Sequence, residues 1–351
     1  MLSSQSLYKG TKVIKTINFV SKLVKKILNS TIKFVLPLLL GAVILYWIYR
    51  DFDFTQLREG LLGMNWWWFT VSVFFGILSH AIRGWRWRLT LAPMGYVPRN
   101  DVCVYSIFIA YAANLIVPRV GEVSRCVVLD RYENVPFAQS LGTVVTERLL
   151  DTLMVLLITI AAVLLQWPVF MEFVVNSFGG AEGASSGSLL NENTIIIGVS
   201  LLAILLLLFF LMKKMSLWSK LKSFIVRFWE GMSTLAKIKN LPLFIFETVA
   251  IWFCYFMQFY ICFFCFSFSS GLSVLAALLL FVGGSIAVVV PTPNGAGPWH
   301  FAVMSIMMLY GVSEGDAQLF ALIVHTSQTL LIAVLGVYAW IMLQFKKVNN
   351  K

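Results

Sequence analysis

The sequence predicts an all-α integral membrane protein with about six transmembrane helices and two re-entrant hairpins in an inverted 3+3 repeat. Hydropathy, charge asymmetry and two similar proline- and glycine-rich breaks lead to this prediction. Hydrophobic residues make up 59% of the 351 residues and charged residues 12%, and the mean hydropathy is +0.84. Several apolar runs can cross roughly 30 Å of hydrocarbon at about 1.5 Å per residue, which excludes a soluble globular protein.

The basic residues are distributed unevenly along the chain. Four segments hold 21 of the 27 lysines and arginines, with Glu230 as their only acid. Because cytoplasmic loops are enriched in lysine and arginine, we expect these segments and both termini to face the cytoplasm of a bacterial-type inner membrane. Segments 168–193 and 311–317 contain acids and no base, so we expect them outside. The basic segments are 1–33, 80–99, 213–240 and 346–351.

The same rule decides how the apolar runs thread the membrane. Runs 102–117 and 272–290 would violate it twice if each crossed alone, because loop 168–193 would then lie inside and loop 213–240 outside. If they instead return as hairpins, 102–137 and 272–310, every loop lies on its expected side. The full crossings are then 34–50, 66–82, 139–167, 194–212, 243–266 and 317–345.

This threading divides the chain into five parts. Two halves repeat the same series of crossings and hairpin in opposite directions. The leader carries seven lysines, no acid and no cleavage pattern of a signal peptide, so we expect it to stay attached. The parts are a basic cytoplasmic leader (1–33), a first repeat (34–167), an extracytoplasmic loop (168–193), a second repeat (194–345) and a basic cytoplasmic tail (346–351).

Each hairpin contains a break of similar construction. The first break reads NLIVPRVGEVSR from Asn114 to Arg125, and the second reads AVVVPTPNGAGPWH from Ala287 to His300. Interrupted hydrophobic segments at matching positions of two halves indicate a transport site near the middle of the bilayer. Irregular backbone at that depth needs cover from protein or a water-filled cavity, so we expect the breaks to line an interior.

The first break carries charges where apolar residues would cost less. Pro118 ends the apolar helix, Gly121 permits close approach, and Arg119, Glu122 and Arg125 follow. Ionisable groups inside the membrane are functional candidates by default. The alternative is a solvated amphipathic helix at the cytoplasmic interface.

The third crossing of the first half adds a polar face. Thr143, Glu147 and Asp151 follow one another at four-residue spacing and share a helical face, with Arg148 beside them. Arginines 119, 125 and 148 balance acids 122, 147 and 151, which suits a zwitterionic head group, or a phosphate when one acid is protonated. The alternative is that these six charges pair with one another and hold hairpin to helix.

The second break crowds prolines and glycines, which force irregular backbone whose free amide groups can face an anion. His300, His325 and Gln328 add polar groups, and we interpret His325 as a structural or polarity-tuning residue, with proton coupling as the alternative. The tryptophans and arginines of segment 83–88 are interpreted as interfacial anchors. The crowded residues are Pro291, Pro293, Asn294, Gly295, Gly297 and Pro298.

Together, the two breaks and TVVTERLLD (143–151) resemble the lysylphosphatidylglycerol synthetase transmembrane region, the flippase domain of multiple-peptide-resistance proteins, over roughly residues 30–345. The resemblance implies a flippase or scramblase that moves a charged or zwitterionic lipid, and membrane lipids as binding partners. Asn294 stands where the family more often has a glycine, and His300 stands where an acidic residue is common. The chain ends six residues after Phe345, so we expect no synthetase activity in it. The substrate site would comprise Asn114, Pro118, Arg119, Gly121, Glu122, Arg125, Thr143, Glu147, Arg148, Asp151, Pro291, Pro293, Asn294, Gly295, Gly297, His300, His325 and Gln328.

Motifs of other classes are missing from the sequence. No phosphate-binding loop, nucleophile elbow or zinc-protease helix occurs, and the five cysteines show no metal-ligand spacing. We therefore expect no enzyme activity, no cofactor, no metal and no nucleic-acid partner. Two alternatives remain: an intramembrane enzyme using Glu147 or His325 as a base on a lipid-linked substrate, and a non-transporting partner of a separate lipid-modifying or glycosyl-transferring enzyme.

Overall fold

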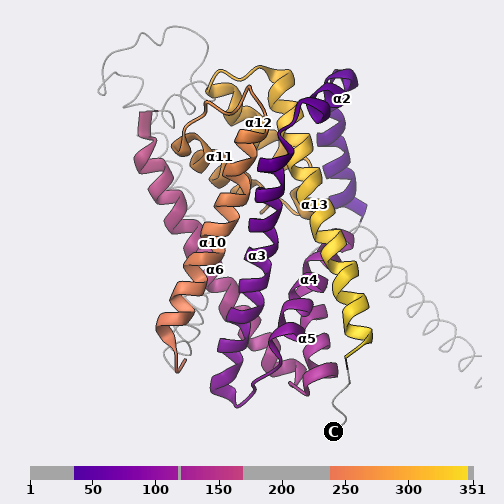
Figure 1. The fold of residues 1–351 in the computed structure, drawn as a ribbon, viewed down its shortest axis with the longest axis vertical. Coiled ribbons are helices and arrows are strands. Elements are labelled where there is room, and N and C mark those ends of the chain that lie inside the picture. The colour runs from indigo at the N-terminus through magenta and orange to yellow at the C-terminus, as the bar shows by residue number, and fades with distance from the viewer. Residues whose placement is uncertain (1–34, 118–119, 169–237, 347–351) are drawn as a thin grey trace, which may run out of the picture.

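The computed structural model describes residues 35–117, 120–168 and 238–346, and every regular element in these ranges is a helix. They form an elongated bundle (Figure 1). Helix α6, segment 241–265 and helix α13 are long and apolar enough to cross a membrane. The elements are helix Val35–Tyr49, α2 (Phe54–Gly63), α3 (Trp66–Leu91), η1 (Ala92–Met94), α4 (Asn100–Ile116), α5 (Val120–Glu133), α6 (Phe137–Leu165), α10 (Leu241–Ile261), η2 (Cys262–Cys265), α11 (Val274–Ala287), η3 (Pro293–Gly295), α12 (Pro298–Leu309) and α13 (Glu314–Gln344).

Side-chain caps explain where several long helices begin. The Asn65 carboxamide accepts from the backbone N–H of Trp67 at 3.1 Å, and Asn240 accepts from Leu243 at 3.3 Å. Ser313 caps α13 in the same way. Such caps satisfy N–H groups that have no partner within the helix, and each contributes about 1 kcal/mol.

Helices α4 and α5 form an antiparallel hairpin, named the inner hairpin. Arg99 and Glu133 close its open end with a 2.6 Å ion pair, and near the tip the Asn114 carboxamide accepts from the Gly121 N–H at 2.8 Å. Helix α4 ends at Ile116 because the residue before a proline is driven into extended conformation. The predicted hairpin is therefore present, although Pro118 and Arg119 lie outside the described residues.

Helices α11 and α12 form the second hairpin. Its break contains a one-turn 3₁₀ helix, and Asn294, Gly295 and Gly297 adopt positive φ angles of 50°, 73° and 93°. The arms approach closely because Gly284 faces the Trp299 indole, where a Cβ would lie only 2.6 Å from its nitrogen. The irregular backbone that the prolines and glycines predict is therefore present.

The two hairpins lie at opposite ends of the bundle, α4–α5 at the lower end and α11–α12 at the upper end (Figure 1). Each has its own apolar core, around Trp87 and Leu129 for the first and around Phe263 and Phe320 for the second. Helices α3 and α10 pack together between them. Helix α13 packs on α4 and helix α6 packs on α11, so the last helix of each half contacts the first arm of the other half's hairpin.

Two parts of the fold differ from the sequence prediction. Helix α3 continues to Leu91 rather than ending near residue 82. Helix α2 bends by 86° from helix Val35–Tyr49 and was not predicted. The predicted crossing 194–212 lies outside the described residues, as do the leader 1–33, most of the loop 168–193 and most of the tail, so the complete six-span repeat stays a prediction.

Candidate functional site

Glu147 is the centre of a sealed ion cluster. Its side chain has no exposed surface, and its Oε2 accepts from Arg125 Nη1 at 2.8 Å. Arg86 Nε lies 3.6 Å from Oε1 and is equally sealed. Because Arg125 lies on α5, Arg86 on α3 and Glu147 on α6, this cluster holds the inner hairpin and α3 against α6. The predicted pairing of hairpin to helix is thus present at Glu147.

Asp151 lies one helical turn further along α6, on the same face. It accepts from Arg83 Nη1 at 2.6 Å, Arg86 Nη2 at 3.3 Å and Arg148 Nη1 at 3.4 Å. Arg148 Nε also donates to Glu122 at 2.8 Å. The Arg148 side chain is 40% exposed, whereas Arg86 has no exposed surface. Arg148 is therefore the most exposed arginine in the described part of this cluster.

Arg83 and Arg86 were predicted to be interfacial anchors, and that interpretation is wrong. Their exposed fractions are 3% and 0%, because α3 continues into the bundle and turns both guanidinium groups towards α6. Trp87 is also buried and donates its indole N–H to Thr143 at 2.8 Å, while its ring lies 4.5 Å from the Arg125 guanidinium carbon. Trp85, 41% exposed, fits the anchor prediction.

A signal for these residues was present in the sequence. Small and polar residues recur on α3 at spacings of three and four, which places them on one helical face. All of them are buried, and the stripe leads directly to the ion cluster. Its members are Ser72, Gly76, Ser79, Arg83 and Arg86.

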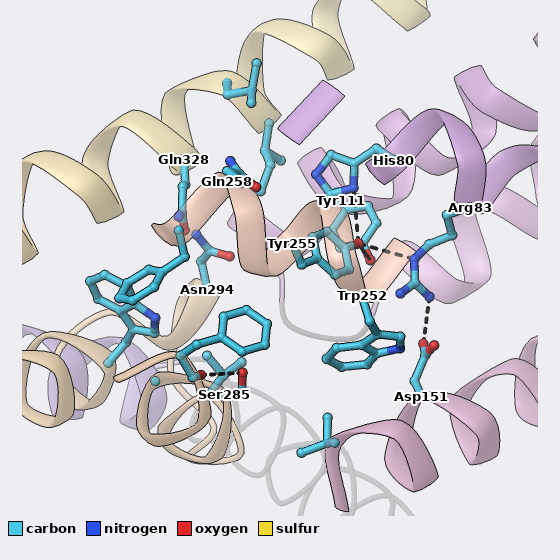
Figure 2. A pocket seen from close by; sticks show the side chains of 18 of the residues that line it. His80, Arg83, Tyr111, Asp151, Trp252, Tyr255, Gln258, Ser285, Asn294 and Gln328 are labelled. Carbon is cyan, nitrogen blue, oxygen red and sulfur yellow. Dashed lines mark hydrogen bonds and ion pairs between the residues drawn. The ribbon is translucent and has the colours of Figure 1, made fainter. Parts of the chain in front are cut away.

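A cavity of about 450 Å³ lies between the two hairpins (Figure 2). Arg83, Arg148 and Asp151 form its charged end. Aromatic side chains form its walls, and amide side chains face it from the opposite side. Other lining residues include His80, Tyr111, Trp252, Tyr255, Gln258, Phe259, Phe281, Ser285, Asn294, Trp299 and Gln328.

A hydrogen-bonded wall holds Arg83 in place beside the cavity (Figure 2). Arg83 Nε donates to the Tyr255 hydroxyl at 3.3 Å, and that hydroxyl lies 3.0 Å from the Tyr111 hydroxyl. His80 Nδ1 lies 3.4 Å from the same Tyr255 oxygen. Both tyrosines line the cavity, so the wall presents hydroxyl groups as well as aromatic surface to it.

The outer hairpin, α11–α12, contributes Asn294 to the cavity, while His300 on α12 and His325 on α13 lie behind the break. His325 Nε2 lies 3.0 Å from the Asn294 carbonyl oxygen, and the Asn294 amide donates to Thr329 at 2.9 Å. The ring centroids of His300 and His325 are 4.4 Å apart. The histidines do not line the cavity, and this position agrees with the interpretation of His325 as a structural residue.

The predicted site residues therefore separate into groups. Arg148, Asp151, Asn294 and Gln328 line the cavity. Asn114 and Arg125 line a much smaller void between the inner hairpin and that cavity. The other described members hold the hairpins or α6 in place and do not line the cavity: Gly121, Glu122, Thr143, Glu147, Pro291, Pro293, Gly295, Gly297, His300 and His325.

Comparison with known proteins shows which family the chain belongs to. The family described as "Lysylphosphatidylglycerol synthase TM region" matches residues 34–336. The chain belongs to this family. No solved structure matches it.

A curated protein with local similarity to this chain is Glycosyltransferase AglD of Haloferax volcanii, which is 31% identical over 78 residues. The match covers 22% of this chain and 12% of AglD. Because so little of AglD is covered, its activity is not assigned to this chain.

Proposed function

We propose that this chain is a membrane lipid flippase or scramblase that moves a lipid with a charged or zwitterionic head group, aminoacyl- or phospho-, between leaflets. One observation carries the proposal: a cavity with two arginines and an aspartate at one end lies between hairpins that enter the bundle from opposite ends. Ionisable residues facing a cavity inside a membrane protein mark substrate pathways. Family membership agrees with a flippase-like role.

In this proposal the head group enters the cavity while the acyl chains remain in the bilayer. A volume of about 450 Å³ lies within the range of small-ligand sites, which is enough for a head group and not for whole acyl chains. Helix α6 has the matching two faces. Arg148 and Asp151 face the cavity, whereas Leu156, Leu157 and Leu164 are more than half exposed on its outside.

The proposal includes the six-span inverted repeat and its orientation in a bacterial-type cytoplasmic membrane. The hairpin at each end and the reciprocal packing of α6 on α11 and α13 on α4 support the repeat. Charges support the orientation, because the end with the α4–α5 hairpin is basic and the opposite end is acidic. Across the described residues, the basic end carries Arg88, Arg99, Arg131, Lys239 and Lys346 against Asp101, Asp130 and Glu133, and the acidic end carries Asp51, Asp53, Glu59, Glu314 and Asp316 against Arg50 and Arg58.

Cysteine labelling tests the orientation. All five native cysteines are buried, so an exposed engineered cysteine should be the dominant target. We expect Ser270→Cys to react with a membrane-impermeant maleimide in intact cells and Arg131→Cys only after permeabilisation. The unmodified protein is the control. The reverse pattern would invert the assignment.

Filling the cavity should stop lipid movement. Ser285 is half-buried on α11 and lines the cavity, so Ser285→Trp places an indole where the head group would pass. We expect dithionite quenching of fluorescent phospholipids in proteoliposomes to show rapid leaflet exchange for the unmodified protein. Exchange in the variant should fall to near the level of protein-free liposomes.

Ser270→Trp is the matched control, since Ser270 is exposed outside the cavity. It should exchange lipid at the unmodified rate, and both variants should elute as the same monodisperse species. Full exchange in a stable Ser285→Trp protein would remove the cavity from the pathway. No exchange by the unmodified protein for any phospholipid or polyprenyl-phosphate lipid would contradict the proposed function.

The position of Glu147 favours transport over intramembrane catalysis. A general base must come within hydrogen-bond reach of the proton it removes. Glu147 is fully sealed, lies outside the cavity lining and is held by Arg125 and Arg86. A separate lipid-modifying enzyme as partner is compatible with this proposal, because it would supply the lipid that the cavity receives.

A further inference from the structure

We infer that the cavity selects an anionic lipid: a phosphate binds at the Arg148 and Arg83 end, and an uncharged, hydroxyl-bearing remainder of the head group contacts the amide side chains opposite. This inference rests on the proposed function and specifies its substrate class. It excludes a net cationic head group such as that of lysylphosphatidylglycerol, the lipid in the name of the family.

The carboxylates of the ion cluster are already occupied by arginines. Asp151 accepts from three guanidinium groups, Glu147 is paired with two, and Glu122 is paired with Arg148. Among the described residues that line the cavity, two arginines, Arg83 and Arg148, meet one acid, Asp151, so the lining carries one positive charge in excess. An ammonium group entering the cavity would find no free carboxylate among the described lining residues, since Asp151 is held by three arginines, and would be repelled by the excess charge. An anion would be attracted.

Arg148 offers that anion a binding surface. A guanidinium group has five N–H donors in a planar fork that matches phosphate oxygens. The Arg148 contacts with protein use Nε, to Glu122, and Nη1, to Asp151, and among the described residues Nη2 has no partner. Its 40% exposed side chain lines the cavity. A phosphate can therefore bind without first breaking the buried pairs of Glu147.

The opposite side of the cavity is polar and uncharged. Within the described ranges, the side-chain amides of Gln258 and Gln328 make no hydrogen bond to protein, and both face the cavity (Figure 2). A further free donor, the buried Trp252 indole N–H, lies nearer the charged end, on the Asp151 side of the cavity, and has no partner among the described residues (Figure 2). Free amides pair well with hydroxyl groups, and the walls of Phe281 and Trp299 suit the apolar face of a glycerol or sugar. A second charge would have no counter-ion on this side.

The test measures leaflet exchange of acyl-labelled lipids in proteoliposomes of one neutral phosphatidylcholine composition. The lipids are phosphatidylglycerol, phosphatidic acid and lysylphosphatidylglycerol, each at trace amount. We expect the initial exchange rate of phosphatidylglycerol to exceed that of lysylphosphatidylglycerol by about tenfold, which corresponds to about 1.4 kcal/mol. Exchange of lysylphosphatidylglycerol at an equal or higher rate would overturn the inference and leave the proposed function intact.

Variants of Arg148 test whether the charged end of the cavity gives the selectivity. Arg148→Gln removes the excess charge, so the ratio of the two rates should fall to near one, while Arg148→Lys should keep most of the preference. Arg131 is an exposed arginine on α5, away from the cavity lining, so Arg131→Gln is the control and should keep the original ratio. A ratio unchanged in Arg148→Gln would overturn the charge assignment.

Gln328→Leu tests the amide side. Phosphatidic acid has no hydroxyl-bearing group beyond its phosphate, so its exchange should be unaffected by Gln328→Leu, while that of phosphatidylglycerol should fall several-fold. An equal loss for both lipids would contradict the placement of the head group. Absence of exchange for all three lipids in the unmodified protein would instead contradict the proposed function itself.

Discussion

Glu147→Gln is expected to lower the free energy of unfolding by about 3–5 kcal/mol, the largest loss of any single charge removal in the described bundle. The variant leaves the buried guanidinium groups of Arg86 and Arg125 without the counter-ion that they share, and Arg86 then keeps only its longer contact with Asp151 among the described ion pairs. Neither arginine can reach water, because their side chains are 0% and 2% exposed. The inner hairpin should therefore separate from α6.

The measurement is thermal unfolding in detergent, followed by the loss of monodisperse protein on size-exclusion chromatography. Glu59→Gln is the matched control, since Glu59 is exposed on α2, and it should change stability by less than about 0.5 kcal/mol. The double variant Glu147→Gln with Arg125→Gln should recover part of the loss, because the two residues contact each other. A Glu147→Gln protein as stable as the Glu59→Gln control would mean that the cluster is not sealed.

Gly121→Ala is expected to destabilise the protein by about 3 kcal/mol or more, because overpacking at a rigid contact forces backbone to move. A Cβ on Gly121 would overlap the carbonyl oxygen of Ala110 on the facing arm. The two nearest atoms belong to the α4 backbone at Ala110, so no side-chain rotation can relieve the overlap. The hairpin arms would separate, and the hydrogen bond from Gly121 N–H to Asn114 would lengthen.

Gly142→Ala is the matched control with the opposite sign. Gly142 lies inside α6, and no atom lies within 4 Å of where its Cβ would be. Alanine should therefore stabilise the helix by about 0.5–1 kcal/mol. The same thermal assay compares both variants with the unmodified protein. Equal stability of the two alanine variants would show that the arms are not in contact at Gly121.

Much of the fold was predictable because membrane helices are encoded locally. An apolar run of sufficient length predicts a crossing, and the prolines after Val117 and Val290 predict breaks, since both signals depend only on neighbouring residues. The charged face of α6 was also predictable, because Glu147 and Asp151 are one turn apart. Helix α2 was missed because it is neither long nor continuously apolar, and its position depends on packing against α13.

The candidate site was predictable in part, for the same reason. The sequence identified Arg148, Asp151, Asn294 and Gln328 as polar residues at interrupted or ionisable positions of apolar segments. The sequence interpretation placed Arg83 at the membrane surface, because a basic residue near a helix end is usually solvated there. Its true partner, Asp151, is 68 residues away along the chain. Periodicity within α3 indicates a buried stripe but carries no information about what faces it.

The sequence by itself determined that this protein lies in a membrane, which segments are apolar helices, where they break and which residues carry charge. Each of these properties follows from the transfer free energy of neighbouring residues into hydrocarbon and from the helical period. Only the tertiary structure decided that Glu147 is sealed and Arg148 more exposed, and that the described cavity lining has two arginines and one acid. Those properties depend on which helices meet, and buried charges take their partners from helices far apart in the chain.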